Sequence, residues 1–104
     1  MNTGKVRMLV YPNPVHDVIH IRIPECIQVR SSTQHLTVTT TFHKWNKELT
    51  IQVTDIAGRI IMRQPIEPGE KDIALPVTGW KPGVYCITLW YGQKIAATEK
   101  VVVE

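Results

Sequence analysis

The sequence predicts an all-β fold, an antiparallel β-sandwich of about seven strands, and three observations support this prediction. Short runs in which apolar and polar residues alternate recur along the chain, as in strands with one buried face. Turn-forming Gly, Pro, Asn and Asp residues separate these runs. No segment has the apolar spacing of a convincing helix. With 104 residues, the chain has the size of one domain with a single core.

The first clear strand is predicted over residues 15–23. One parity of this run is almost entirely apolar and comprises Val15, Asp17, Ile19, Ile21 and Ile23. Residues 11–14 precede it and read Tyr-Pro-Asn-Pro. Two prolines fix φ, remove two backbone donors and favour extended conformations before them. We therefore expect a rigid rim segment that leads into a half-buried strand.

The segment 25–47 is more polar and rich in threonine. It contains a plausible strand at 35–42, bounded by Ser31-Ser32 and by Asn46. We expect an inserted or edge hairpin here.

A second hairpin is predicted around residues 55–58. Apolar and polar residues alternate over 49–54, and the chain returns over 59–64. Asp55 at the first turn position can accept backbone N–H bonds, and Gly58 at the fourth tolerates positive φ.

The last part of the chain predicts three more strands. A strand over 71–75 is followed by the turn 80–83, in which Pro-Gly suits the centre of a type II turn. Strands over 83–91 and 94–103 then pair across a two-residue connection at Gly92-Gln93. This organisation is typical of an immunoglobulin-like sandwich. The final strand runs to the end of the sequence, so we expect an exposed strand edge there.

Composition and charge exclude several classes of function. The net charge is +3, but the basic residues are scattered singly among acidic ones, so we expect no nucleic-acid partner. The apolar stretches are strand-sized and no signal-peptide core begins the chain, so we expect no membrane span and no signal for the Sec pathway in this sequence. Cys26 and Cys86 have no CxxC spacing; free or buried thiols are favoured, and one long-range disulfide stays open.

Candidate catalytic and metal-binding residues are weak. Three aspartates, Asp17, Asp55 and Asp72, fit turn or strand-surface roles, and Ser31 and Ser32 lack a nucleophile elbow. We therefore predict no enzyme activity and no cofactor.

The histidines do not predict a metal site. His16 and His20 lie four apart, which on a strand is about 13 Å, too far for one metal ion. His35 and His43 could meet across a hairpin, but they lack a third ligand.

Aromatic residues suggest one alternative function. Trp45, Trp80, Trp90 and Tyr91 could present faces to sugar rings. The favoured interpretation is structural: Trp80 packs at a turn, Trp90 covers a sheet face and Trp45 caps the inserted hairpin.

Several motifs together resemble the type A C-terminal sorting domain of type IX secretion cargo in Bacteroidetes. The resemblance covers nearly the whole chain from Met8, and the segment 25–47 is longer than the family's usual connection. The motifs stand in this order: Val10-Tyr11-Pro12-Asn13-Pro14 with the strand to Ile23, Val53-Thr54-Asp55-Ile56-Ala57-Gly58-Arg59, Leu75 through Gly83-Val84-Tyr85, and Lys100-Val101-Val102-Val103.

The resemblance implies a non-catalytic secretion signal. Family members pass through the periplasm, and the domain directs a cargo through an outer-membrane translocon. A sortase-like surface peptidase then commonly removes the domain and joins the cargo to lipopolysaccharide at the cell surface. Residues 1–7 would be a linker, residues 8–104 the sorting domain, and the cargo would lie N-terminal to them.

Physical arguments add roles for single residues under this resemblance. The translocon would recognise the terminal strand by β-augmentation, through Lys100, Val101, Val102 and Val103. The fold that presents this strand would depend on Pro12, Asn13, Pro14, Asp55, Gly58, Gly83 and Tyr85. Edge strands leave self-association open. The alternatives are a surface module that binds carbohydrate and a structural Ig-like spacer.

Overall fold

The computed structural model describes the chain except residues 1–7, 25–26, 34–35, 43–47 and 68. Nine strands and no helix occur among the described residues. In chain order they are β1 (Leu9–Tyr11), β2 (Val18–Arg22), β3 (Ile27–Thr33), β4 (Leu36–Phe42), β5 (Leu49–Asp55), β6 (Ile60–Ile66), β7 (Asp72–Pro76), β8 (Gly83–Tyr91) and β9 (Lys94–Val103).

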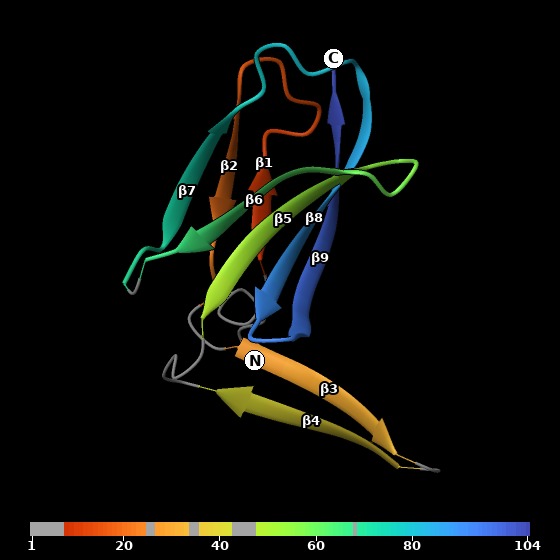
Figure 1. Cartoon of the computed structure of the whole chain (residues 1–104). Coiled ribbons are helices and arrows are strands. Elements are labelled where there is room, and N and C mark those ends of the chain that lie inside the picture. The colour runs from red at the N-terminus through yellow and green to blue at the C-terminus, as the bar shows by residue number, and fades with distance from the viewer. Residues whose placement is uncertain (1–7, 25–26, 34–35, 43–47, 68) are drawn as a thin grey trace.

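Seven of these strands form two antiparallel sheets that face each other (Figure 1). One sheet has the order β1-β2-β7 and the other has the order β6-β5-β8-β9. The predicted all-β, immunoglobulin-like sandwich is therefore confirmed. The remaining strands, β3 and β4, pair only with each other as a hairpin beside the sandwich.

The core lies between the two sheets and consists of the apolar parity of each strand. In β2, Ile19 and Ile21 are fully buried while His20 and Arg22 are exposed, as the alternation predicted. The same alternation buries Leu49, Ile51 and Val53 of β5. The fully or nearly fully buried partners from the other strands and from the segments between them include Met8, Val15, Leu75, Ile87, Leu89, Val101 and Val103. Burial of these side chains is the main favourable contribution to folding.

The predicted hairpin in the segment 25–47 is confirmed, with one correction. Ser31 and Ser32 were expected to bound a strand in a polar loop, but they lie inside β3 and pair with Val38 and Thr37. Small polar residues suit a hairpin outside the core as well as a turn, so composition alone could not separate these alternatives. His35 lies outside the described residues.

The turn between β5 and β6 is built around the Asp55 carboxylate. Its Oδ1 accepts the backbone N–H of Ala57 and of Arg59, both at 2.9 Å, and its Oδ2 accepts Arg59 Nε at 2.8 Å. Gly58 donates its N–H to the Asp55 carbonyl at 3.0 Å and has φ of 85°. The predicted turn and its mechanism are confirmed.

The turn predicted at residues 80–83 is misplaced. The hydrogen-bonded turn is Val77 to Trp80, in which Trp80 N–H donates to the Val77 carbonyl at 2.9 Å. Gly79 has φ of 87° in this turn, whereas Gly83 already begins β8. The segments 77–80 and 80–83 each contain a glycine. The turn was predicted in the second segment because a Pro-Gly pair is typical of type II turns.

The last hairpin agrees with its prediction. β8 and β9 pair from Gly83 opposite Val103 to Tyr91 opposite Lys94, with one register shift next to Trp90. Gly92 has φ of 63° in the connecting turn. The hairpin places the end of β9 beside the beginning of β8.

Substitution of Gly58 by Val is expected to lower the free energy of unfolding by about 1–3 kcal/mol, because a β-branched residue is strained at positive φ. No atom outside its immediate neighbours lies within 4 Å of a Cβ built at Gly58, so backbone strain alone causes the loss. Urea denaturation measures the effect. Gly58→Asn is the matched control and should lose less, because Asn tolerates this conformation. An unchanged midpoint for Gly58→Val would contradict the turn assignment.

Candidate recognition site at the end of β9

The four residues predicted for recognition divide into two pairs. Val101 and Val103 point into the core and are 0% and 3% exposed. Lys100 and Val102 lie on the outer face of the four-stranded sheet and are exposed. Val102 lies opposite Val84 of β8, and both are 38% exposed. Only one parity of this strand can therefore offer side chains to a partner.

The expectation of an open strand edge here is wrong. β9 is the last strand of its sheet, but Val15 pairs with it through a parallel bridge to Val103. Val15 N–H donates to the Val102 carbonyl at 2.8 Å, and Glu104 N–H donates to the Val15 carbonyl at 3.0 Å. A segment from near the beginning of the chain thus lies against the end of β9.

Asn13 extends this pairing with its side chain. Its Nδ2 donates to the Lys100 carbonyl at 3.3 Å, and its Oδ1 accepts the Val102 N–H at 2.9 Å. The side-chain amide therefore takes the place that a peptide group of a neighbouring strand would take. Pro12 and Pro14 flank Asn13 and have no N–H to donate, so the pairing at this point falls to the Asn side chain.

The segment between β1 and β2 connects the two sheets. The chain leaves β1 in the three-stranded sheet, pairs with β9 of the four-stranded sheet through Val15, and returns to the three-stranded sheet as β2. Residues 12–17, between β1 and β2, are called the crossing segment here. The predicted motif of Pro12, Asn13 and Pro14 lies in this segment. Its contact with the residues proposed for recognition was not foreseen from the sequence.

The other predicted fold-supporting residues lie at the same end of the sandwich. Tyr85 pairs with Val101 on one side and with Asp55 on the other. The Tyr85 side chain is 7% exposed, and its hydroxyl donates to the Lys81 carbonyl at 2.6 Å. Asp55, Tyr85 and Val101 therefore lie side by side on the neighbouring strands β5, β8 and β9.

Trp80 and Gly83 complete this end of the molecule. The Trp80 ring packs on Tyr85 with centroids 5.1 Å apart, as expected for a structural aromatic residue. Gly83 has φ of 155°, a value that residues with a side chain rarely adopt. The position of Gly83 opposite Val103 places it directly beside the candidate site.

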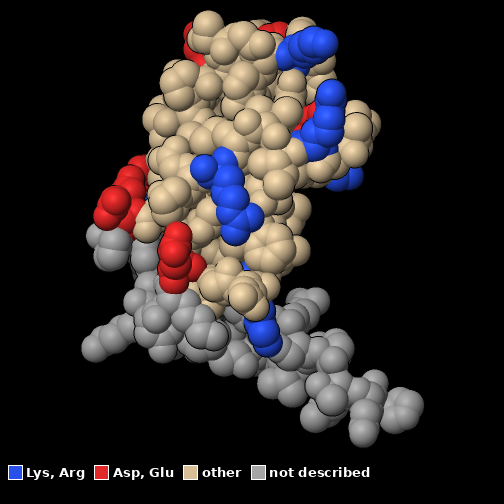
Figure 2. All heavy atoms as spheres, in the orientation of Figure 1, with Lys and Arg blue, Asp and Glu red and all other residues tan. Residues whose placement is uncertain are grey.

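Basic residues are spread over the face of the four-stranded sheet. Figure 2 shows Lys and Arg side chains along the visible face, with acidic side chains at its left and top margins and also among the basic ones. Lys100 belongs to the outer face of this sheet. The exposed Lys100 side chain can pair with an acidic group of a partner, while the exposed Glu104 carries the opposite charge at the same strand end.

The aromatic residues do not form an open platform within the described part of the chain. Tyr91 is buried at 2% exposure, and Arg63 lies over the Trp90 ring at 5.9 Å from its centroid. Trp80 is engaged with Tyr85, and Trp45 falls outside the described residues. A sugar ring would therefore have to displace existing contacts.

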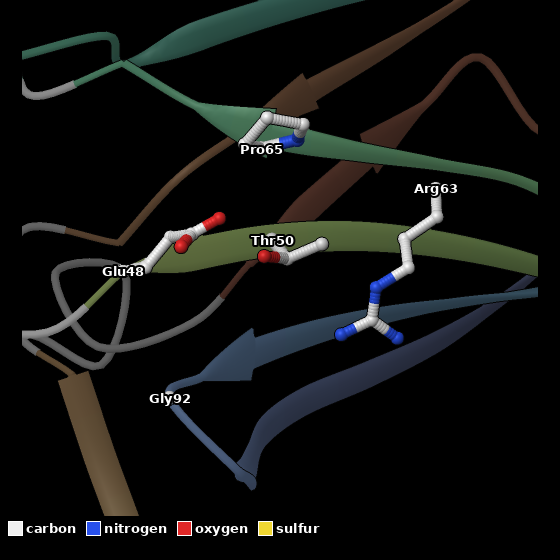
Figure 3. Close-up of a pocket in the computed structure, with 5 residues that line it drawn as sticks. All are labelled: Glu48, Thr50, Arg63, Pro65 and Gly92. Carbon is white, nitrogen blue, oxygen red and sulfur yellow. The ribbon is translucent and has the colours of Figure 1, made fainter.

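A hollow of about 440 Å³ lies over β5, next to the β8–β9 turn (Figure 3). Its lining residues are Glu48, Thr50, Arg63, Pro65 and Gly92. Arg63 donates to Gln52 Oε1 at 2.7 Å and also covers Trp90, so its guanidinium is already engaged.

The histidines and the thiol of the described residues form no cluster with metal-binding geometry. No group of three His, Cys, Asp or Glu side chains is placed to hold a metal ion there. His20 stacks on Tyr11 with ring centroids 5.3 Å apart, and His16 lies 3.7 Å from a Glu104 carboxylate oxygen at the surface. Cys86 is a free, half-buried thiol, while Cys26 and His43 lie outside the described part.

The described part of the chain contains no helix with the length and apolar character to cross a bilayer.

Comparison with known proteins gives one match. A family model described as "Secretion system C-terminal sorting domain" matches residues 9–104. No curated protein and no solved structure matches the chain. The matched range includes both the crossing segment and the end of β9.

Asp55 is expected to make the free energy of unfolding of the domain depend on pH in the acidic range. Backbone N–H donation by Arg59, followed by its side-chain bond and charge, lowers the pKa of Asp55 from its ordinary 3.8. The carboxylate's contribution is therefore complete above the ordinary pKa and is lost as the pH falls through the lowered value. Asp55→Asn should be less stable than wild type at pH 7, and this difference should shrink below pH 3.8. Thermal melts across this range test it; a difference that does not change with pH would contradict it.

Removal of the Asn13 side chain is expected to cost about 1–2 kcal/mol, because two exposed hydrogen bonds to β9 are lost. Denaturant unfolding of Asn13→Ala measures this loss. Asn13→Asp keeps the acceptor but not the donor, so its stability should also fall below that of wild type. Wild-type stability in both variants would show that the side-chain pairing contributes nothing.

Proposed function

Because residues 9–104 match their family model, the chain belongs to the secretion system C-terminal sorting domains, and we propose that it directs a cargo protein through the type IX outer-membrane translocon. Domains of this family are in general signals rather than enzymes. Such a signal implies a cargo domain N-terminal to it and a secretion system. The export route leads to the cell surface or the medium.

One observation supports the end of β9 as the signal. The crossing segment and the start of β8 both pair with this strand end, and the Asp55 turn lies on the other side of β8. The side chains of Lys100 and Val102 are the part of the proposed recognition residues that a partner can reach. Val101 and Val103 act by holding the strand in the core.

The remaining steps follow the family resemblance. The domain would pass through the periplasm with its cargo, and a sortase-like surface peptidase would remove it and join the cargo to lipopolysaccharide. Residues 8–104 would form the signal, with residues 1–7 as a linker. Met8 is 1% exposed and packs in the core, which supports a boundary before it.

Fusion of the domain behind a periplasmic reporter tests this function in a type IX-competent bacterium. The intact fusion should reach the cell surface, and deletion of residues 100–104 should abolish display. This deletion also removes Val101 and Val103 from the core, so a thermal melt must show that the truncated domain still unfolds cooperatively. Failure of the intact fusion, folded and abundant in the periplasm, would contradict the proposal.

A sharper variant changes only the outward side chains. The double substitution Lys100→Glu with Val102→Asp should lower surface display about tenfold. This effect corresponds to a loss of about 1.4 kcal/mol in the free energy of binding to the translocon. The matched control is Lys71→Glu with Leu9→Asp, because it makes the same kinds of charge change at the other sheet. Leu9 is 39% exposed, nearly the same exposed fraction as the 38% of Val102. Equal display of the two double variants would exclude recognition through Lys100 and Val102.

A further inference from the structure

The end of β9 is paired with the crossing segment through two residues, Val15 and Asn13. These two residues differ in how firmly they are held in the core. Val15 is 0% exposed and packs in the core, so its bonds to Val102 and Glu104 are anchored. Asn13 is exposed, and its two hydrogen bonds to β9 come from its side-chain amide. The Asn13 pairing can therefore open without removing an apolar side chain from the core.

The Asn13 pairing is also weaker than a strand pairing. Its bond to the Lys100 carbonyl is 3.3 Å long, slightly longer than the usual range of N–H···O bonds. Both of its bonds are exposed to water, which competes for each of them. The flanking prolines, Pro12 and Pro14, have no N–H with which to continue a ladder along β9.

The two groups that Asn13 occupies are those that an added strand would need. The Lys100 carbonyl and the Val102 N–H both point away from β8, on the outer edge of the sheet. Lys100 and Val102 also carry the exposed side chains of the candidate site. A segment that paired with these groups would lie directly beside both side chains.

We infer that the position of the Asn13 side-chain amide is the docking position for the backbone of an extended peptide segment of the translocon, which displaces Asn13 and pairs with β9. The inference rests on the proposed function and adds its mode of recognition. The segment donates one backbone N–H to the Lys100 carbonyl and accepts the Val102 N–H. An acidic side chain on the segment complements Lys100, and an apolar one covers Val102 and Val84.

Asn13 thereby has a role in the free domain. An unpaired strand edge pairs with other chains and promotes aggregation. The Asn13 amide satisfies the edge until a partner with a regular backbone replaces it. The anchored Val15 keeps the two sheets joined during the exchange.

Amide hydrogen exchange measured by NMR tests the opening. The Val102 N–H, bonded to the exposed Asn13 side chain, should exchange at least about tenfold faster than the Val15 N–H, since local opening releases the first and not the second. In Asn13→Ala the Val102 N–H should exchange faster still, while Val15 changes little. Equal exchange of both amides in the wild type, at the rate of global unfolding, would overturn the inference.

Proline substitution tests the docking in the reporter fusion. Val102→Pro removes the N–H that points away from β8 and leaves the hydrogen bonds between β8 and β9 intact. Edge strands tolerate proline where the missing N–H would point away from the sheet. Val102→Ala is the matched control, because it removes the same side chain and keeps the N–H. Val102→Pro should be displayed about tenfold less than Val102→Ala, with both domains unfolding cooperatively.

The outcomes separate the inference from the proposed function. Absence of display for the wild-type fusion would overturn the sorting function and the inference with it. Display of the wild type together with equal display of Val102→Pro and Val102→Ala would overturn the inference alone. Loss of display in a cooperatively folded Asn13→Ala domain would also overturn it, because Asn13 is displaced in the exchange.

Discussion

The pairing of Val15 with the end of β9 is the interaction on which the rest of this structure depends. In the sequence, Val15 lies between β1 and β2 of the three-stranded sheet. Its backbone hydrogen bonds, however, join the chain to Val102 and Glu104 at the end of the four-stranded sheet. Its side chain is fully buried, and its bridge partner Val103 is 3% exposed. The pairing therefore joins the two sheets along one edge and fixes the position of the strand end that we propose as the signal.

This arrangement makes the fold and the proposed signal difficult to separate. Within four consecutive residues, Val101 and Val103 belong to the core while Lys100 and Val102 face outward. Loss of two valines from a core costs several kcal/mol, a large part of the stability of a small domain. Truncations at this end therefore test folding and recognition together, whereas substitutions of the outward residues test recognition.

The strands of the sandwich could be predicted because their sequence signal is local. Alternation in β2 and β5 identified the buried parity, and the Gly92-Gln93 connection fixed the last hairpin. The turn chemistry of Asp55 and Gly58 was also readable, since each residue has a physical reason to occupy its position. Local patterns could not separate the turn at Gly79 from the Pro-Gly pair at Pro82 and Gly83.

The candidate site was predicted only in part, for a different reason. The terminal residues were identified by their family motif, but the pairing of Asn13 with Val102 spans 89 positions and leaves no periodic signal. The one available sign was an asparagine between two prolines, since such a segment offers few backbone donors and must pair through its side chain. The strand edge was consequently expected to be open, whereas the structure closes it.

Closure of the end of β9 by the crossing segment is tested most directly by NMR couplings through hydrogen bonds. We expect a coupling between the Glu104 amide nitrogen and the Val15 carbonyl carbon, and another between the Val15 nitrogen and the Val102 carbonyl carbon. Close contacts between the Val15 and Val103 methyl groups should accompany them. Absence of both couplings and of these contacts, in a sample whose β5–β8 couplings are present, would contradict the claim and leave the end of β9 as an open edge.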